Sequence, residues 1–205
     1  MKDGATGQTR IQRTKIAAIT DAALEVFSTN GFKGATVDQI AKAAGLSKPN
    51  LLYYFPSKEA IPSHLLDTLM DTWVAPLREI DPDGEPLDEL LTYVRRKLAM
   101  SRDMPRESRL FANEILQGAD YIGPALSNDL RPLVDEKAAM IARWMEDGML
   151  QPSDPRHLIF SIWSLTQHYA DFDVQVRRVL GPGVKDPFPD AETYLITLFT
   201  RMLRV

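Results

Sequence analysis

Residues 35–61 read ATVDQIAKAAGLSKPNLLYYFPSKEAI, and this stretch predicts two short helices separated by a tight turn. Thr36 opens a capping-box pattern that begins the first helix, and Gly45 permits the left-handed backbone that ends it. Ser47 can cap the second helix, residues 48–55, which carries a proline near its first turn where the missing N–H costs nothing. The spacing therefore predicts a helix-turn-helix.

The helix at residues 48–55, here called the recognition helix, has the chemistry of a DNA-reading segment. Its first turn offers a cation in Lys48, an apolar ring in Pro49 and an amide in Asn50, all of which can meet base edges in a major groove. Tyr54 and Lys58 flank it and can reach phosphates, as can free N–H groups at the starts of neighbouring helices.

Helical signals dominate the remaining sequence, so we expect an all-α protein of about nine helices. The first helix should run from Arg10 to Thr29 and stop at Asn30-Gly31. A helix from Ser57 should be kinked or ended by Pro76, and it either starts at Pro62 or has a distorted first turn. Further helices are expected at residues 86–104, 105–117, 124–147, 155–180 and 189–203.

Charge and composition narrow the class of protein. The net charge is −4, but residues 1–60 hold eight Lys/Arg and five Asp/Glu (8 − 5 = +3), which leaves −7 for the remainder (−4 − 3 = −7). This charge distribution would orient the basic head toward a polyanion and repel the acidic body from it. The chain has no cysteine, no secretory signal pattern and no membrane-spanning run, so we expect a cytoplasmic protein.

The quoted stretch, together with FSTNGF at residues 27–32, resembles the helix-turn-helix signature of the TetR family of transcriptional regulators. The resemblance implies a DNA-binding domain at residues 1–56 and a ligand-binding and dimerisation domain at residues 57–205. It implies that Tyr53 and Phe55 pack inside the head, while Leu52 departs from the usual aromatic residue. It assigns contact with double-stranded operator DNA to Thr36, Lys48, Pro49, Asn50, Tyr54 and Lys58.

A homodimer is expected because one recognition helix contacts few base pairs, and two half-sites lie about 34 Å apart. The last two predicted helices have surplus apolar side chains, and the family resemblance places a four-helix dimer bundle there. The same side chains could instead fill the core of one chain, and both uses are compatible. They are Leu158, Ile162, Leu165, Leu195, Leu198 and Met202.

The body is most similar to the pyrimidine-responsive branch of the family, through runs such as SRDMPRESRLF (101–111) and DPRHLIFSIWSLTQHYADF (154–172). That similarity implies a pocket for uracil or thymine whose binding releases the operator. We expect the helix from Ser57, with Pro76, to act as the lever, because it contacts the head at one end and offers Trp73 toward the body. An amide such as Gln167 complements the edge of a pyrimidinedione, and aromatic faces suit its ring. The expected pocket residues are Trp73, Leu77, Phe111, Glu114, Trp163, Gln167 and His168.

Other interpretations remain open. Gln167, His168 and Asp171 could form a buried polar network or a dimer contact instead of a ligand site. The body could bind a larger hydrophobic ligand, which a big apolar cavity without convergent polar groups would favour. A helical metal-dependent enzyme is the competing class, in which Glu114, His168 and Asp171 would converge on a metal ion. The sequence has no metal-binding or nucleophile motif that supports it. We therefore expect no catalytic residue, metal or cofactor.

Overall fold

A computed structural model describes residues 10–205, and the regular structure in that range is entirely helical. The helices of the head and the lever are α1 (Arg10–Gly34), α2 (Val37–Ala43), α3 (Lys48–Tyr54) and α4 (Ala60–Arg78). The body adds α5 (Pro86–Asp103), α6 (Pro105–Leu116), α7 (Gly123–Ala125), a π-helix (Leu126–Leu130), α8 (Arg131–Glu146), α9 (Pro155–Asp171), α10 (Asp173–Leu180) and α11 (Phe188–Leu203). Residues 1–9, the start of the predicted head domain, lie outside the described range.

Most predicted boundaries of the head helices are confirmed by the backbone. Gly31 has φ 66° and ψ 170°, so α1 is kinked at the glycine expected to stop it, but the helix resumes and ends at Gly34, beyond the predicted end at Thr29. Thr36 accepts from the Gln39 N–H at 3.2 Å while the Gln39 side chain accepts from the Thr36 N–H at 2.8 Å, which completes the capping box. Gly45 has φ 65°, and Ser47 caps α3. The chain therefore turns between α2 and α3 as the sequence predicts.

Both prolines of α4 are accommodated near its ends. The helix begins at Ala60, so Pro62 lies in the first turn, where an N–H has no intrahelical partner. Ser57 Oγ accepts from the Ala60 N–H at 3.3 Å. Pro76 lies two residues before the last residue of α4, so it precedes the end of the helix rather than dividing it.

One of two predicted long helices is wrong in its continuity. The helix expected at residues 124–147 is present, but Leu126–Leu130 is wound as a π-helix just before Pro132, which lacks the N–H that would bond to the carbonyl four residues back. The helix expected at residues 155–180 breaks at Phe172, which has φ −115° and ψ 28°. Ser108 of α6 donates to Asp171 at 2.5 Å, and the Phe172 ring stacks on His168 with centroids 5.1 Å apart. Tertiary contacts thus accompany a break that no proline or glycine marks.

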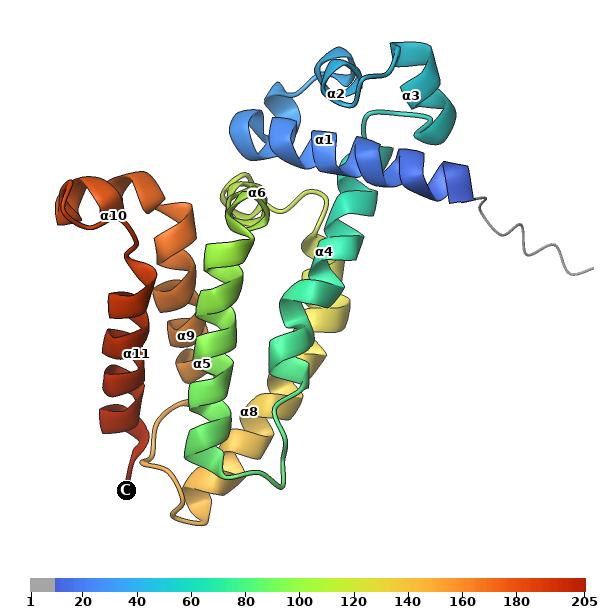
Figure 1. The fold of residues 1–205 in the computed structure, drawn as a ribbon. Helices are drawn as coiled ribbons and strands as arrows, with labels where there is room; N and C mark the ends of the chain where they lie inside the picture. Colours follow the sequence, from blue (N-terminus) through green and yellow to red (C-terminus); the bar gives the residue numbers. More distant parts are fainter. Residues whose placement is uncertain (1–9) are drawn as a thin grey trace, which may run out of the picture.

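The helices enclose two hydrophobic cores (Figure 1). The core of the head contains Phe27, Ile40 and Leu51, and it continues into α4 through Leu65 and into α6 through Leu110. The second core lies among α5, α8, α9 and α11. In Figure 1, α4 runs from beneath the head into the body, and α6 lies against α1. Two body helices therefore contact the head directly.

Candidate DNA interface and ligand pocket

The first turn of the recognition helix is open to solvent. Lys48, Pro49 and Asn50 are all exposed, whereas Leu51 on the opposite side is fully buried in the core of the head. The Ser47 hydroxyl accepts from the Asn50 N–H at 3.4 Å, which leaves the Asn50 side-chain amide without a role in the cap. The head therefore presents a cation, an apolar ring and an amide at the exposed start of α3.

Three of the predicted DNA contacts, Thr36, Lys48 and Lys58, already form hydrogen bonds within the protein. Lys48 Nζ lies 2.9 Å from Asp38 Oδ2, and both side chains are about half exposed or more. An exposed pair of this kind contributes little stability, so a phosphate or base can replace the carboxylate at small cost. The Thr36 hydroxyl donates to Gln39 Oε1 at 3.0 Å, so its capping role competes with DNA contact.

The aromatic residues at the end of α3 differ from expectation at one position. Phe55 is buried as predicted, but Tyr53 is 73% exposed, so its expected place inside the head is wrong. Its ring packs edge-on against half-buried Tyr54, with centroids 5.1 Å apart. Lys58, which was predicted to contact DNA phosphates, donates from Nζ to the Lys33 carbonyl at 3.4 Å. Tyr53 is thus a further exposed phenol that sequence reasoning missed.

The body contains a cavity between α4, α5, α6 and α9, with about 370 Å³ of unoccupied space including its opening. Its walls are mainly apolar and aromatic, and its polar side chains are few. The lining residues are Met70, Trp73, Val74, Leu77, Tyr93, Lys97, Phe111, Leu130, Trp163 and Gln167. A mostly apolar cavity with a few convergent polar groups has the character of a small-molecule site.

Five of the seven residues predicted for the pocket meet in this cavity. They are Trp73, Leu77, Phe111, Trp163 and Gln167. The rings of Trp73 and Phe111 lie 6.3 Å apart at an interplanar angle of 21°, so an α4 residue stacks on an α6 residue at the cavity wall.

Glu114 and His168 do not line the cavity. The buried carboxylate of Glu114 accepts backbone N–H bonds from Tyr121 at 2.6 Å and Ile122 at 3.4 Å, so it anchors the segment after α6. His168 is exposed and borders a separate surface hollow with Tyr194 of α11. Gln167 and His168 are consecutive in sequence, but the helical period places them on different faces of α9.

Tyr93 and Lys97 of α5 also face the cavity, and sequence reasoning missed both. Trp163 Nε1 donates to the Tyr93 hydroxyl at 2.6 Å, and burial raises the pKa of Tyr93. Lys97 is only 2% exposed. Burial lowers the pKa of Lys97 to about 7, and the Asp171 carboxylate opposes this decrease. The available signal was the spacing of Lys97, four residues after Tyr93 and three after Val94, on the apolar face of α5.

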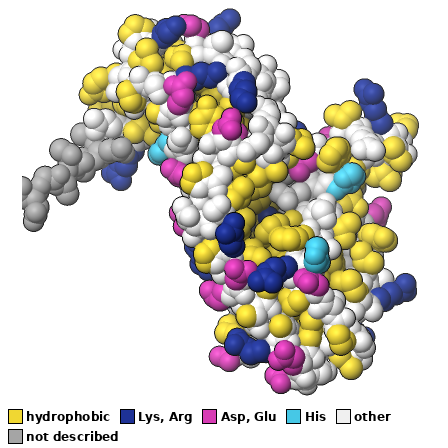
Figure 2. All heavy atoms as spheres, turned by 180° about the vertical axis from the view of Figure 1, so that it is seen from behind, with side chains coloured by type: hydrophobic (Ala, Val, Ile, Leu, Met, Phe, Trp, Pro, Cys, Tyr) yellow, Lys and Arg dark blue, Asp and Glu magenta, His cyan; other side chains and the backbone are white. Residues whose placement is uncertain are grey.

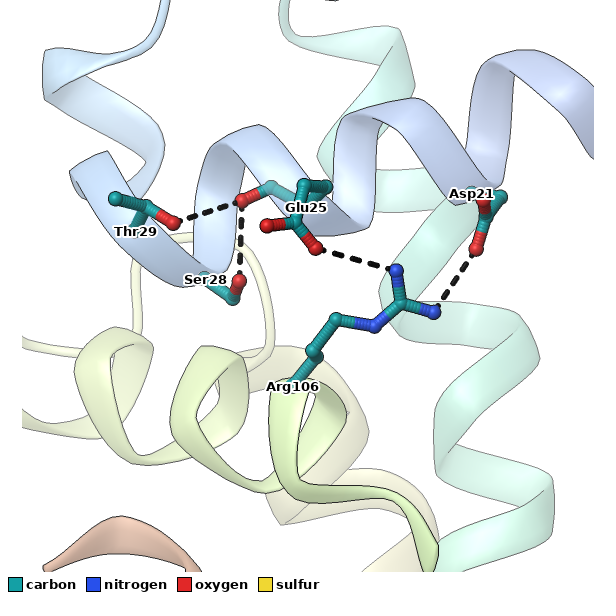
Figure 3. A network of polar contacts seen from close by, with 5 residues as sticks. All are labelled: Asp21, Glu25, Ser28, Thr29 and Arg106. Carbon is teal, nitrogen blue, oxygen red and sulfur yellow. Dashed lines mark hydrogen bonds and ion pairs between the residues drawn. The ribbon is translucent and has the colours of Figure 1, made fainter. Parts of the chain in front are cut away.

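A polar contact connects α6 of the body to α1 of the head (Figure 3). Arg106 of α6 bonds to Asp21 Oδ1 at 2.9 Å and to Glu25 Oε2 at 3.2 Å, and both acidic residues belong to α1. Two residues later on α6, Ser108 donates to Asp171 of α9, the carboxylate that acts on Lys97. Helix α6 therefore bears contacts to the head and to the surroundings of the cavity.

The residues predicted for a dimer bundle divide between core and surface. Leu158, Ile162 and Leu195 are buried in the core of one chain, while Leu165 and Leu198 are partly buried and Met202 is 41% exposed. Phe160 and Tyr194 are also exposed. Figure 2 shows hydrophobic side chains gathered on a face of the body. The intrachain interpretation therefore holds for the buried residues, and exposed apolar side chains remain on α9 and α11.

Two further properties concern residues 10–205. No helix there is long and apolar enough to cross a membrane. In the same range, no three His, Asp or Glu side chains converge as metal ligands, so Glu114, His168 and Asp171 do not form a metal site.

Comparison with known proteins agrees with this geometry. Residues 19–63 match the bacterial regulatory proteins of the tetR family, and residues 66–204 match the family described as YcdC-like protein, C-terminal region. The HTH-type transcriptional regulator RutR of Escherichia coli K12 is 50% identical over 179 residues, which cover 87% of this chain and 84% of that protein.

Solved structures share the fold at lower identity. The ketosteroid transcriptional regulator KstR2 of Mycobacterium tuberculosis has a TM-score of 0.76 at 18% identity, covering 97% of this chain and 98% of the other. A transcriptional regulator from Streptomyces coelicolor, SCO4942, has a TM-score of 0.73 at 24% identity, covering 91% and 97%. On the evidence of its two family matches and its half-identical relative, the chain belongs to the TetR family of helix-turn-helix transcriptional regulators and is not an enzyme.

Proposed function

We propose that the protein is a homodimeric repressor that leaves a palindromic operator when its body binds uracil or thymine. Residues 1–56 would contact DNA and residues 57–205 would bind the effector and the second copy. The exposed apolar side chains on α9 and α11 support dimerisation through that face. A regulator of this kind acts where the operator is, so we place it in the cytoplasm.

The observation that carries the effector proposal is the cavity that brings four aromatic side chains and one amide together. Trp73, Phe111 and Trp163 offer ring faces, and Gln167 offers a donor and an acceptor in one plane. The cavity is narrow, which favours a small planar ring over a bulky ligand. A bulky hydrophobic ligand is disfavoured because a lysine and a glutamine also line the wall.

The DNA interface can be tested with Lys48→Ala combined with Asn50→Ala. Duplex DNA selected from a random pool by the wild-type protein would serve as the probe in a mobility-shift assay. We expect the double variant to lose binding, because a cation and an amide at the front of α3 are removed while Leu51 stays in the core. Lys185→Ala, a lysine exposed in the loop after α10, is the control and should bind normally. Undiminished binding by the double variant would refute the interface.

The effector can be tested by calorimetry and thermal unfolding with uracil and thymine. We expect saturable heat and a raised melting temperature for the wild type, because a ligand that binds only the folded state stabilises it. Gln167→Ala should weaken binding, whereas Gln175→Ala, an exposed glutamine of α10, should not. Absence of heat and of stabilisation at millimolar ligand would exclude both pyrimidines as effectors.

A further inference from the structure

The cavity must be reached from solvent, and two surface hollows share wall residues with it. Trp73, on the cavity wall, is only 8% exposed, so a ligand that contacts it has to pass other side chains first. One hollow lies between α6 and α9 and shares Phe111 and Gln167 with the cavity. The other lies between α4 and the segment of α7 and the π-helix, and it shares Met70 and Val74. Each hollow is a candidate entrance.

The two hollows differ in how tightly they are separated from the cavity. Met70 and Val74 are each 7% exposed, whereas Phe111 and Gln167 are both half-buried. The hollow beside α4 also has three carboxylates on its wall, whose hydration a neutral ligand would disturb. They are Asp67, Asp71 and Asp129. The barrier to passage is therefore lower between α6 and α9.

The hollow between α6 and α9, here called the α6–α9 mouth, has an apolar rim. Leu116 is 81% exposed, Phe172 53% and Ile115 40%. Exposed apolar side chains gathered at one hollow are typical of binding grooves, and they suit the faces of a planar ring. Phe111 belongs to the walls of both the mouth and the cavity, and its ring lies 6.3 Å from that of Trp73. Phe111 thus separates the rim from the interior.

We propose that the effector enters and leaves the body through the α6–α9 mouth, and that Phe111 is the side chain it must pass. This inference rests on the proposed function of the cavity. The Phe111 side chain has no hydrogen-bonding group, so its ring can rotate aside without breaking a polar contact. The mouth contacts the ligand only in transit. Obstructing it should therefore slow binding and release by the same factor and leave the dissociation constant unchanged.

The chain has no cysteine, so one engineered cysteine can carry a removable obstruction. Ala112 lines the mouth but not the cavity, and Ala125 lines the hollow beside α4 but not the cavity. Both are half-buried helical alanines, which makes Ala125→Cys a matched control for Ala112→Cys. Each variant would be labelled with a methyl or a benzyl methanethiosulfonate, and the mixed disulfide can be reversed with a thiol reductant.

The assay is stopped-flow tryptophan fluorescence of the full-length protein mixed with uracil. We expect the benzyl label on Ala112→Cys to slow association and dissociation about tenfold or more, and the smaller methyl label to slow both less. The dissociation constant should stay within about twofold, and reduction of the disulfide should restore both rates. Neither label on Ala125→Cys should change the rates. Circular dichroism of each labelled protein checks that its helices are intact.

A second measurement does not depend on the effector. Acrylamide is a small planar amide that quenches tryptophan fluorescence on contact, and Trp73 and Trp163 line the cavity. We expect the benzyl label on Ala112→Cys to reduce quenching by acrylamide, because the label obstructs the route to these rings. The same label on Ala125→Cys should leave quenching unchanged.

The outcomes separate this inference from the proposed function. If uracil binds and the labels on Ala112→Cys leave its rates unchanged, or those on Ala125→Cys slow them instead, the route is wrong while the effector stands. If the label on Ala112→Cys weakens binding without slowing association, it acts on the bound ligand and the inference is overturned. If neither uracil nor thymine binds, the proposed effector fails; reduced acrylamide quenching then still supports the route, and equal quenching with both labels overturns it.

Discussion

The buried charge of Lys97 should reduce the stability of the protein, and its removal gives a quantitative prediction. Burial lowers the pKa of Lys97 from 10.5 to about 7. Unfolding at pH values between these two takes up a proton, so stability rises with pH in that window. Lys97 costs the folded state no stability above pH 10.5, where the amine is neutral in both states. The cost in free energy of unfolding grows as pH falls and reaches about 5 kcal/mol at most near pH 7.

Lys97→Met fills the same space with an apolar side chain and should remove this penalty. We expect the variant to be more stable than the wild type by up to about 5 kcal/mol at pH 6.5, with the advantage shrinking about tenfold in the folding equilibrium constant per pH unit above 7. The assay is urea unfolding followed by circular dichroism between pH 6 and 9.5, without ligand and at one protomer concentration, because the stability of a dimer depends on concentration.

Lys137→Met gives the matched comparison. It removes a buried lysine that donates to Ile80, and it should destabilise the protein by about 1–3 kcal/mol because a buried carbonyl loses its donor. If Lys97→Met is destabilising at pH 6.5, or if its advantage does not shrink toward pH 9.5, the reasoning about an uncompensated buried charge is refuted.

Two further predictions concern the head and its contact with the body. Thr36→Ala removes the side-chain half of the capping box with Gln39 and should cost about 1 kcal/mol of stability together with a loss of operator affinity, measured by thermal unfolding and mobility shift; unchanged values of both would contradict the role of the cap. Arg106→Ala breaks the exposed ion pairs with Asp21 and Glu25, so it should change the free energy of unfolding by less than about 1 kcal/mol. It should nevertheless reduce the effect of uracil on operator affinity severalfold, and an unaltered effect would show that the contact carries no coupling.

The head was predictable from sequence because its folding signals are local. A cap at Thr36, a left-handed glycine at Gly45 and a cap at Ser47 lie within twelve residues, and each sets the backbone of its immediate neighbours. The positions of Lys48 and Asn50 on the exposed side of α3 then follow from helical periodicity and the burial of Leu51.

The body was less predictable because its decisive contacts join residues that are distant in sequence. The break at Phe172 accompanies a hydrogen bond from Ser108 to Asp171, sixty-three residues apart, and no local signal announces it. The spacing of Lys97 places it on the apolar face of α5, but only the packing of α4 and α9 against α5 shows that its side chain is buried at a cavity. Glu114 has the residue type of a ligand-binding group, but its carboxylate serves the backbone of Tyr121.

Coupling between the cavity and the head requires a structural element whose arrangement depends on both. The contact of Trp73 with Phe111 is such an element, because it joins α4 and α6 at the cavity wall. Trp73 belongs to α4, whose upper part lies in the core of the head, and Phe111 belongs to α6, whose Arg106 contacts α1. We expect a ligand that changes how these two rings pack to tilt at least one of the two helices that contact the head.

A ligand can shift the two arrangements of the head only by the difference in its affinity for them. If the Trp73 and Phe111 rings keep their packing when uracil binds, neither helix has a reason to move, and the distance between the two recognition helices of a dimer should stay the same. Crystals of the protein with and without uracil would show this directly. Equal spacing of the recognition helices, together with release of DNA in solution, would mean that the effector acts by a route other than helices α4 and α6.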